Sequence, residues 1–313
     1  MMKASTTFAA GAALLASTAA VAGPFAPGAG VAGTTAIAKT DPAFVAWAAS
    51  YSNYQPGSPV DAGFRTPEKA LGPAVGDSFD IVSLGKAGSI TLSFSGTLFN
   101  GPGWDFAVFE NGFSNSTTLP RLLRVRRSDV AQDSLLSRLI DITLSEARQR
   151  RIGGEAGRLR LSELAFVEVS SDGANFFRFP AFSFTPSAVG AFGSIDPTNI
   201  DGFAGKYRQG FGTPFDLDVF KNASGINVNA ITHVRLVDVV GNGSEFDSFP
   251  SSLGGPHPIF DPFPTTGSVG FDLDAVGARH YAASPVPLPP ALLSFGAAAG
   301  VLAARRRRAR TQA

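Results

Sequence analysis

The sequence contains no cysteine and only three histidines, His233, His257 and His280. Without cysteine the chain cannot form disulfides, thiolate nucleophiles, cysteine zinc sites or iron–sulfur clusters. Three scattered histidines also leave little for a transition-metal site that depends on imidazole. A metal site in this chain is therefore expected to use oxygen ligands and to hold a hard cation.

Charge is also scarce: charged residues make up 16% of the chain, and the formal net charge is +1. Most of the positive charge is concentrated, because Lys3 and the arginines of 305–310 lie at the ends and residues 114–160 hold ten arginines against five acids. The rest of the body is left at about −10. Because phosphate binding needs clustered lysine and arginine, this balance argues against nucleic acid as the partner of the body.

Aromatic and turn-forming residues are abundant, with 27 Phe, 35 Gly and 22 Pro. Residues 89–94 alternate apolar side chains with Ser and Thr, the pattern of a half-buried strand. Asp172-Gly173 lies between two strand-like runs and predicts a hairpin turn. Further strands are predicted over 79–84, 104–110, 165–170, 176–179, 231–240 and 269–276. The pattern indicates an all-β fold, an antiparallel β-sandwich of jelly-roll type.

Two segments favour helix within this β pattern. Residues 41–54 begin with Asp41 and Pro42, a pair suited to a helix N-terminus, and predict a short helix. Residues 128–151 are rich in Leu and Ile and lack Gly and Pro, so they predict a helical insertion within the arginine-rich stretch 114–160. That insertion offers either a basic surface for anionic polysaccharide or lipid headgroups, or simply the solvated face of a packing helix.

The N-terminus is typical of a secretory signal. Residues 1–22 combine Lys3, an apolar run over 8–16, and Ala20-Val21-Ala22 before Gly23. A positive start, a short apolar core and a small-residue cleavage site define a signal peptide. We therefore expect the mature chain to begin at Gly23 and to be exported.

The C-terminus carries an apolar stretch followed by a basic cluster. The apolar residues, about 290–304, precede the arginines of 305–310. A helix of about 14 residues reaches ~21 Å, a marginal transmembrane span that flanking residues extend. Because arginine is retained on the cytoplasmic side, the body is expected to lie outside the inner membrane.

This segment, 284–313, resembles the PEP-CTERM sorting signal in its Val-Pro-Leu-Pro-Ala variant. Pro290 stands in place of the Ala, and the matching residues are Val286, Pro287, Leu288 and Pro289, followed by Arg305, Arg306, Arg307 and Arg308 after the helix. The resemblance implies recognition and cleavage by an exosortase, an integral-membrane cysteine protease of Gram-negative bacteria. The alternative is an ordinary membrane anchor that stays on the protein.

Residues 65–280 resemble a recurrent domain of PEP-CTERM surface proteins that usually has no assigned activity. The resemblance includes residues 101–112, 163–173 and 270–277, and the arginine-rich insertion departs from it. The expected organisation is a signal peptide at 1–22, a leader with a short helix at 23–64, a β-sandwich surface domain at 65–283 and a sorting signal at 284–313.

Acidic and amide side chains at strand ends are the main candidates for chemistry. Asp272 and Asp274 are two residues apart on a predicted strand, so they are expected to share one face. Calcium takes six to eight oxygen ligands, and strand-end acids distant in sequence can supply them in a sandwich. The predicted calcium ligands are Asp105, Glu110, Asn111, Glu168, Asp272 and Asp274. The alternative is that these acids are solvent-exposed strand and turn residues.

Paired carboxylates also raise the alternative of an extracellular carbohydrate-active hydrolase, with Glu110 and Glu163, or Glu168 and Asp274, as the pair. Trp104 follows a Gly-Pro-Gly loop and is a candidate sugar contact. The sequence contains no Gly-x-Ser-x-Gly elbow for a serine hydrolase. We therefore expect an exported, exosortase-processed, non-catalytic surface or matrix protein, calcium-stabilised and associated with polysaccharide, with no catalytic residues.

Overall fold

The structure, a computed structural model, describes residues 23–114, 160–161, 163–191 and 193–284. The predicted signal peptide, the predicted helix at 128–151 and the predicted sorting tail from residue 285 onwards lie outside these residues. Within the described ranges, no helix is both long and apolar enough to cross a membrane.

The described chain is all-β, and the first of its two large sheets is antiparallel and six-stranded. Its order is β1 (Ile37–Ala38), β13 (Phe211–Phe215), β6 (Phe106–Glu110), β17 (Asp272–Ala278) and β2 (Ala46–Trp47), with β4 (Val82–Ser83) also paired to β17. Every residue of the central strand β6 is buried. Because both faces of β6 pack against other side chains, the strand lacks the alternation of a half-exposed strand.

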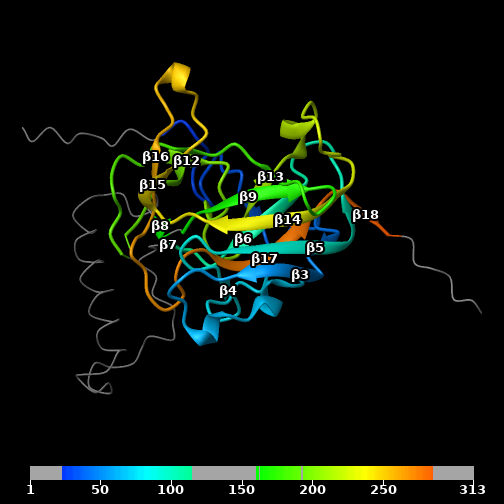
Figure 1. Cartoon of the computed structure of the whole chain (residues 1–313), viewed down its shortest axis with the longest axis horizontal. Coiled ribbons are helices and arrows are strands. Elements are labelled where there is room, and N and C mark those ends of the chain that lie inside the picture. The colour runs from blue at the N-terminus through cyan, green and yellow to red at the C-terminus, as the bar shows by residue number, and fades with distance from the viewer. Residues whose placement is uncertain (1–22, 115–159, 162, 192, 285–313) are drawn as a thin grey trace, which may run out of the picture.

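The second large sheet is also antiparallel and six-stranded. Its order is β10 (Phe177–Arg178), β9 (Ala165–Ser170), β14 (Ile231–Asp238), β5 (Ser89–Leu98) and β18 (Tyr281–Ala283), with β3 (Ser50–Gln55) paired to β5. Figure 1 shows β9, β14 and β5 side by side. One hydrophobic cluster contains Leu92 and Val234 from this sheet together with Phe106 and Leu273 from the other. The two sheets therefore share a core.

Smaller elements connect and cover the sheets. Three two-stranded pairs are β7 (Phe113–Ser114) with β8 (Arg160–Leu161), β11 (Phe182–Ser183) with β12 (Ile200–Asp201), and β15 (Asn242–Phe246) with β16 (Pro258–Phe260). Single-turn 3-10 helices are η1 (Ala62–Phe64), η2 (Pro67–Ala70), η5 (Pro197–Asn199), η6 (Leu217–Phe220) and η7 (Ser251–Leu253).

The sequence patterns that predict strands are confirmed in the described residues. The predicted strand at 165–170 is β9, and the alternating run 89–94 lies within β5. The hairpin is also confirmed, because β9 and β10 pair antiparallel around Asp172 and Gly173. Gly173 has φ +74°, a left-handed conformation that glycine adopts without strain.

The short helix predicted over 41–54 is wrong. This stretch forms β2 and β3, which pair with β17 and β5 respectively. The helix propensity of its alanines amounts to tenths of a kcal/mol, whereas pairing with a sheet satisfies the backbone and buries side chains. Residues 23–64, expected to be a leader, thus contribute β1, β2 and β3 to the two large sheets.

Candidate functional site

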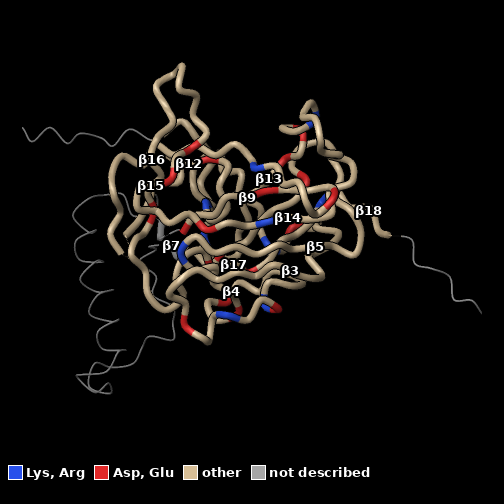
Figure 2. The backbone as a smooth tube through the Cα atoms, in the orientation of Figure 1, with Lys and Arg blue, Asp and Glu red and all other residues tan. Residues whose placement is uncertain are grey.

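Five acidic side chains that are far apart in the sequence are buried within the body. We call Glu110, Glu163, Asp238, Asp261 and Asp272 the interior acid cluster. Their exposed fractions range from 1% for Asp238 to 9% for Glu163. By contrast, the acidic positions of the whole body, red in Figure 2, are spread over many strand ends and loops. Burying five acids needs a physical explanation, because an ionised carboxylate is strongly stabilised by water.

The strand topology brings the cluster together. Strand β6 ends at Glu110, beside the start of β17 at Asp272. Strand β14 ends at Asp238, beside the start of β9, and Glu163 lies just before that start. In antiparallel pairs the end of one strand adjoins the start of the next, so these four acids collect at strand ends. Asp261 follows β16 directly and joins them.

The hydrogen-bond donors to four of these carboxylates are neutral. They are Ser83 Oγ to Asp272 Oδ1 (2.5 Å), Phe271 N and Ala87 N to Asp238 (2.6 and 2.9 Å), Leu164 N to Asp261 Oδ2 (2.9 Å) and Gly112 N to Glu110 Oε2 (2.5 Å). The Ser268 side chain also hydrogen-bonds to Asp272. Among the described residues, no lysine or arginine forms an ion pair with any member of the cluster. The cluster therefore has donors but no counter-charge in the described part of the chain.

Glu163 is the least satisfied member. A hydrogen bond with Thr265 reaches its carboxylate. Its Oε1 atom is buried and has no hydrogen-bond partner. A buried polar atom without a partner costs about 1–3 kcal/mol, and more when the group is charged. This oxygen is therefore the point at which the cluster lacks an interaction.

Burial dominates the protonation of the cluster. It raises the pKa of Asp238 to about 8, although the Phe271 and Ala87 amides oppose the rise. Burial likewise raises the pKa of Asp272 to about 7. The pKa values of Glu110 and Glu163 are well above the usual range because of burial first and repulsion from Asp272 second. Neutral carboxyls, or an added positive charge, are the two ways to relieve this repulsion.

A small cavity lies beside the cluster. Its volume is about 10 Å³, and its lining includes Glu163, Asp238, Asp261 and Thr265. A cavity of this size accommodates about one water molecule or one small ion. Lys86 also lines it, and its ammonium lies 4.9 Å from the centroid of the Phe263 ring.

Two glycines allow the backbone to approach these carboxylates. A Cβ atom on Gly241 would lie 1.6 Å from Asp261 Oδ1, and one on Gly270 would lie 2.5 Å from Asp238 Oδ1. Both glycines also have positive φ, +74° and +69°. Gly270 lines the cavity, whereas Gly241 lies against Asp261 outside its lining. At both positions a side chain would collide with a carboxylate, so the backbone fits closely around these acids.

Of the six predicted calcium ligands, the structure brings Glu110 and Asp272 together and gives other partners to the remaining four. Asp105 accepts hydrogen bonds from Gly101 N and Leu217 N, and it lies 2.6 Å from His280 Nδ1. Asp274 accepts from Val75 N and Gly76 N, both at 2.9 Å. Each of these carboxylates therefore holds a loop.

Glu168 and Asn111 also have defined partners. Glu168 pairs with Arg178 (2.8 Å) and Arg235 (2.5 Å) on neighbouring strands β10 and β14. The Asn111 side chain accepts a hydrogen bond from Gln209 Nε2 at 2.7 Å. The Glu168 charge is thus matched by two guanidinium groups, in contrast to the charges of the interior acid cluster.

Trp104, the predicted sugar contact, is half-buried. Its ring lies 5.3 Å from the Phe44 ring, and the Arg279 guanidinium lies 5.2 Å from its centroid. The indole therefore has protein neighbours in a satellite cluster with Phe44 and Phe109. Its role as a ligand contact stays a prediction.

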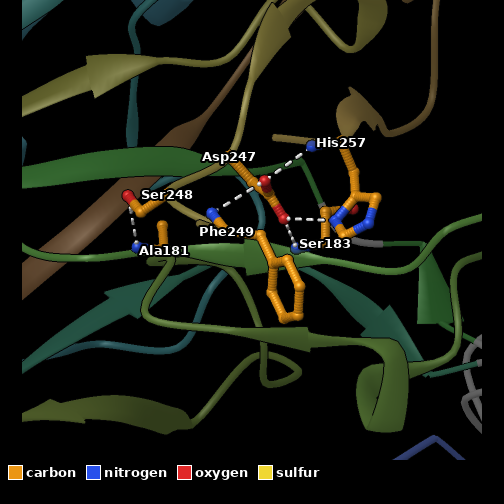
Figure 3. Close-up of polar contacts among 6 residues, drawn as sticks. All are labelled: Ala181, Ser183, Asp247, Ser248, Phe249 and His257. Atoms are coloured by element: carbon orange, nitrogen blue, oxygen red, sulfur yellow. Dashed lines mark hydrogen bonds and ion pairs between the residues drawn. The ribbon is translucent and has the colours of Figure 1, made fainter. Parts of the chain in front are cut away.

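A second polar centre surrounds Asp247 (Figure 3). Its carboxylate accepts hydrogen bonds from Ser183 N, Phe249 N and His257 N, at 2.7 to 3.0 Å, and lies 3.2 Å from His257 Nδ1. Burial acts to raise the pKa of Asp247, but these donors outweigh it and lower the pKa below its usual value. Both oxygens of the Asp247 carboxylate therefore accept hydrogen bonds, and these bonds connect β11 to the segment before β16.

An open hollow lies elsewhere on the body. It has a volume of about 260 Å³, and its lining includes Phe182, Lys206, Asp201, Asp216 and Thr213. Lys206 Nζ lies 3.0 Å from the Asp201 carboxylate, and burial lowers the pKa of this lysine. A ring beside acidic, basic and hydroxyl groups is the chemistry with which proteins contact small polar ligands.

The interior acid cluster is only partly anticipated by the sequence. Glu110 and Asp272 belong to the predicted ligand set, Glu163 is a candidate only for the hydrolase pair, and Asp238 is recognisable only as an acid at a strand end. Asp261 is missed as a ligand, although its position directly after β16 is the same strand-end signal.

Within the described residues, no three Asp, Glu or His side chains form a metal-ligand group as they stand. No protein-family model matches the chain. A search of the curated proteins likewise finds no match.

Proposed function

We propose that this chain is an exported, exosortase-processed protein of the bacterial cell surface or extracellular matrix. Its signal-like residues 1–22 and the tail with Val286, Pro287 and the arginine cluster support this location. We further propose that the body is a β-sandwich of jelly-roll type, which agrees with two six-stranded antiparallel sheets that share one core. Exosortase is the proposed processing partner, and the membrane contact precedes cleavage.

A non-catalytic role is supported by the burial and ion pairing of the carboxylates that a hydrolase would use. Glu110 and Glu163 are 3% and 9% exposed, and Glu168 is paired with two arginines. A glycosidase needs two carboxyl groups that flank a sugar bond, one to donate a proton and one to act as base or nucleophile. An acid that is almost fully covered by protein, or that is paired with two arginines, is poorly placed to contact a sugar bond. A structural role is therefore favoured over the hydrolase.

The proposed mechanism is adhesive. The sheets present loops outward, while a bound calcium ion stabilises acidic strand ends in the interior. The hollow beside Phe182 and Lys206, and the half-buried Trp104, are the candidate contacts for an extracellular polysaccharide. Each contact can be weak, because once one copy on a surface has bound, binding of its neighbours is favoured by their high effective concentration.

Intact mass of the protein isolated from its native host tests this proposal. Export and sorting predict a chain that begins at Gly23 and has lost the arginine cluster. A mass that retains the arginines supports a plain membrane anchor instead. A mass that retains residues 1–22, with the protein in the cytosolic fraction, contradicts the proposal.

Turnover assays on the host's polysaccharides separate the adhesive role from the hydrolase. The adhesive role predicts retention of the protein on polysaccharide without release of sugar. Sugar release that disappears in Glu110→Gln would support the hydrolase and overturn the adhesive role.

A further inference from the structure

We propose that the cavity beside Glu163 binds one calcium ion, with the unpartnered Glu163 Oε1 as its principal ligand. Asp238, Asp261 and Thr265 line the same cavity and supply the other side-chain oxygens. The inference rests on the structural calcium of the proposed function. It moves that ion to a ligand set centred on Glu163, which lies outside the set predicted from the sequence.

The first support is the unsatisfied oxygen itself. Glu163 Oε1 is buried without a hydrogen-bond partner, in a side chain that is 9% exposed and borders the cavity. Folded proteins rarely leave a buried carboxylate oxygen without a partner, because the lost hydration is not replaced. A cation in the cavity replaces that hydration directly.

The second support is the charge around the cavity. Three carboxylates line it, and Asp272 and Glu110 act on Glu163 by repulsion. Lys86 is the one cationic side chain in the lining, and its ammonium lies over the Phe263 ring. In the described residues it makes no ion pair with these acids. A divalent ion supplies the positive charge that these carboxylates otherwise lack.

The third support is the size and chemistry of the space. About 10 Å³ holds one ion that has shed most of its water, but not a fully hydrated ion. Calcium sheds water readily and accepts irregular sets of carboxylate, hydroxyl and backbone carbonyl oxygens. Magnesium demands octahedral geometry and gives up its water reluctantly. The cavity therefore favours calcium over magnesium.

The described side chains do not form a finished ligand group, so the carboxylates must move toward the ion when it binds. Asp238 and Asp261 are already oriented by the backbone amides of Phe271 and Leu164. Each of their oxygens keeps a free lone pair for the ion. Hydrogen-bonded carboxylates of this kind are typical of metal ligands that the protein orients in advance.

Calcium titration of the full-length chain, stripped with EDTA, tests the site by calorimetry and native mass spectrometry. We expect one calcium per chain and at least tenfold weaker binding in Glu163→Gln. Glu168→Gln is the matched control, because it makes the same change at a carboxylate that already has two arginines, and it should bind calcium like the wild type. Magnesium at the same concentration should neither bind comparably nor displace calcium.

Two results overturn the site: no calcium bound by the folded wild type, or unchanged binding in Glu163→Gln. If Glu163→Gln fails to fold, Asp261→Asn, which keeps an acceptor for Leu164 N, takes its place with the same expected loss. The test is independent of location and turnover. A cytosolic protein that binds calcium through Glu163 refutes the proposed function alone, whereas an exported protein without calcium refutes the site alone.

Discussion

Asp247 and Glu163 are both buried carboxylates, yet their surroundings are opposite. Asp247 accepts three backbone amides and lies beside His257, so every oxygen has partners. Glu163 has a hydrogen bond with Thr265 and one oxygen with none. The pKa of Asp247 is therefore lowered, because its donors outweigh the effect of burial. The pKa of Glu163 is raised, because burial dominates there.

The difference shows how partners, rather than burial alone, decide what a buried acid does. A carboxylate that receives several donors stays ionised and holds the chain together. One that receives few donors, among other acids, needs a proton or a metal ion. The hydrogen bonds of Asp247 therefore stabilise the local fold, whereas the interior acid cluster needs protons or a metal ion to neutralise its charge.

The largest expected effect is at Asp247. Asp247→Ala leaves the amides of Ser183, Phe249 and His257 without their acceptor. Because buried donors without partners each cost about 1–3 kcal/mol, we expect a loss of about 3–5 kcal/mol in the free energy of unfolding. Urea denaturation measures it. Asp247→Asn keeps one acceptor oxygen and should lose less; equal losses would mean that these hydrogen bonds contribute little.

Glu163→Gln should have the opposite sign in metal-free protein. Because burial raises the pKa of Glu163, folding of the wild type requires either a buried charge or the uptake of a proton. The amide requires neither and still accepts a hydrogen bond from Thr265. We expect the free energy of unfolding in EDTA to rise by about 1–3 kcal/mol. Glu168→Gln should lower it, since that acid loses two arginine partners. If both variants lose stability in EDTA, the contrast between partnered and unpartnered acids fails.

The two regions also predict opposite responses to pH. Asp238 is protonated in the fold but ionised in the unfolded chain between about pH 4 and 8, and Asp272 between about pH 4 and 7, because their folded pKa values are about 8 and 7. Their contribution to stability is complete below pH 4 and is lost as the pH rises through those values. The contribution of Asp247 is present above its unfolded pKa and is lost as the pH falls through its lowered folded pKa.

Urea denaturation in EDTA from pH 4.5 to 8.5 tests this response. The loss of stability towards pH 8 should be smaller in Asp238→Asn, and calcium should reduce it in the wild type. A slope that is the same in Asp238→Asn and the wild type would exclude Asp238 as a source of the pH response.

The smallest expected effect is at the exposed end of the Glu168 pair. The Arg178 side chain is 45% exposed, and Arg235 still pairs with Glu168 when Arg178 is removed. Exposed ion pairs contribute at most about 1 kcal/mol, so Arg178→Ala should cost less than that. Thermal unfolding at low and high salt measures the change. A larger cost that persists at high salt would point to packing of Arg178 on Phe166, whose ring centroid lies 4.0 Å away.

The sequence predicts the strands better than it predicts their pairing. The alternation in β5 and the Asp172-Gly173 turn are local signals, and both are confirmed. The failure at 41–54 has a long-range cause. Strand β2 pairs with β17, about 230 residues further on, and β3 pairs with β5, about 40 residues further on. Local propensity contains no information about such partners.

The candidate site follows the same rule. The sequence identifies acids at strand ends, and Glu110 and Asp272 do lie at adjoining strand ends within the cluster. It does not show that Glu168 faces two arginines across neighbouring strands, because the register of β9, β10 and β14 is needed for that. Nor does it show that Asp261 reaches the cluster, because a close approach to Gly241 allows it.

A crystal structure of the protein grown with calcium, with data collected for anomalous scattering, tests the central claim most directly. The account predicts one anomalous peak in the cavity, within bonding distance of Glu163 Oε1. Density without that peak, with the Lys86 ammonium or a water molecule against Glu163 instead, would contradict it.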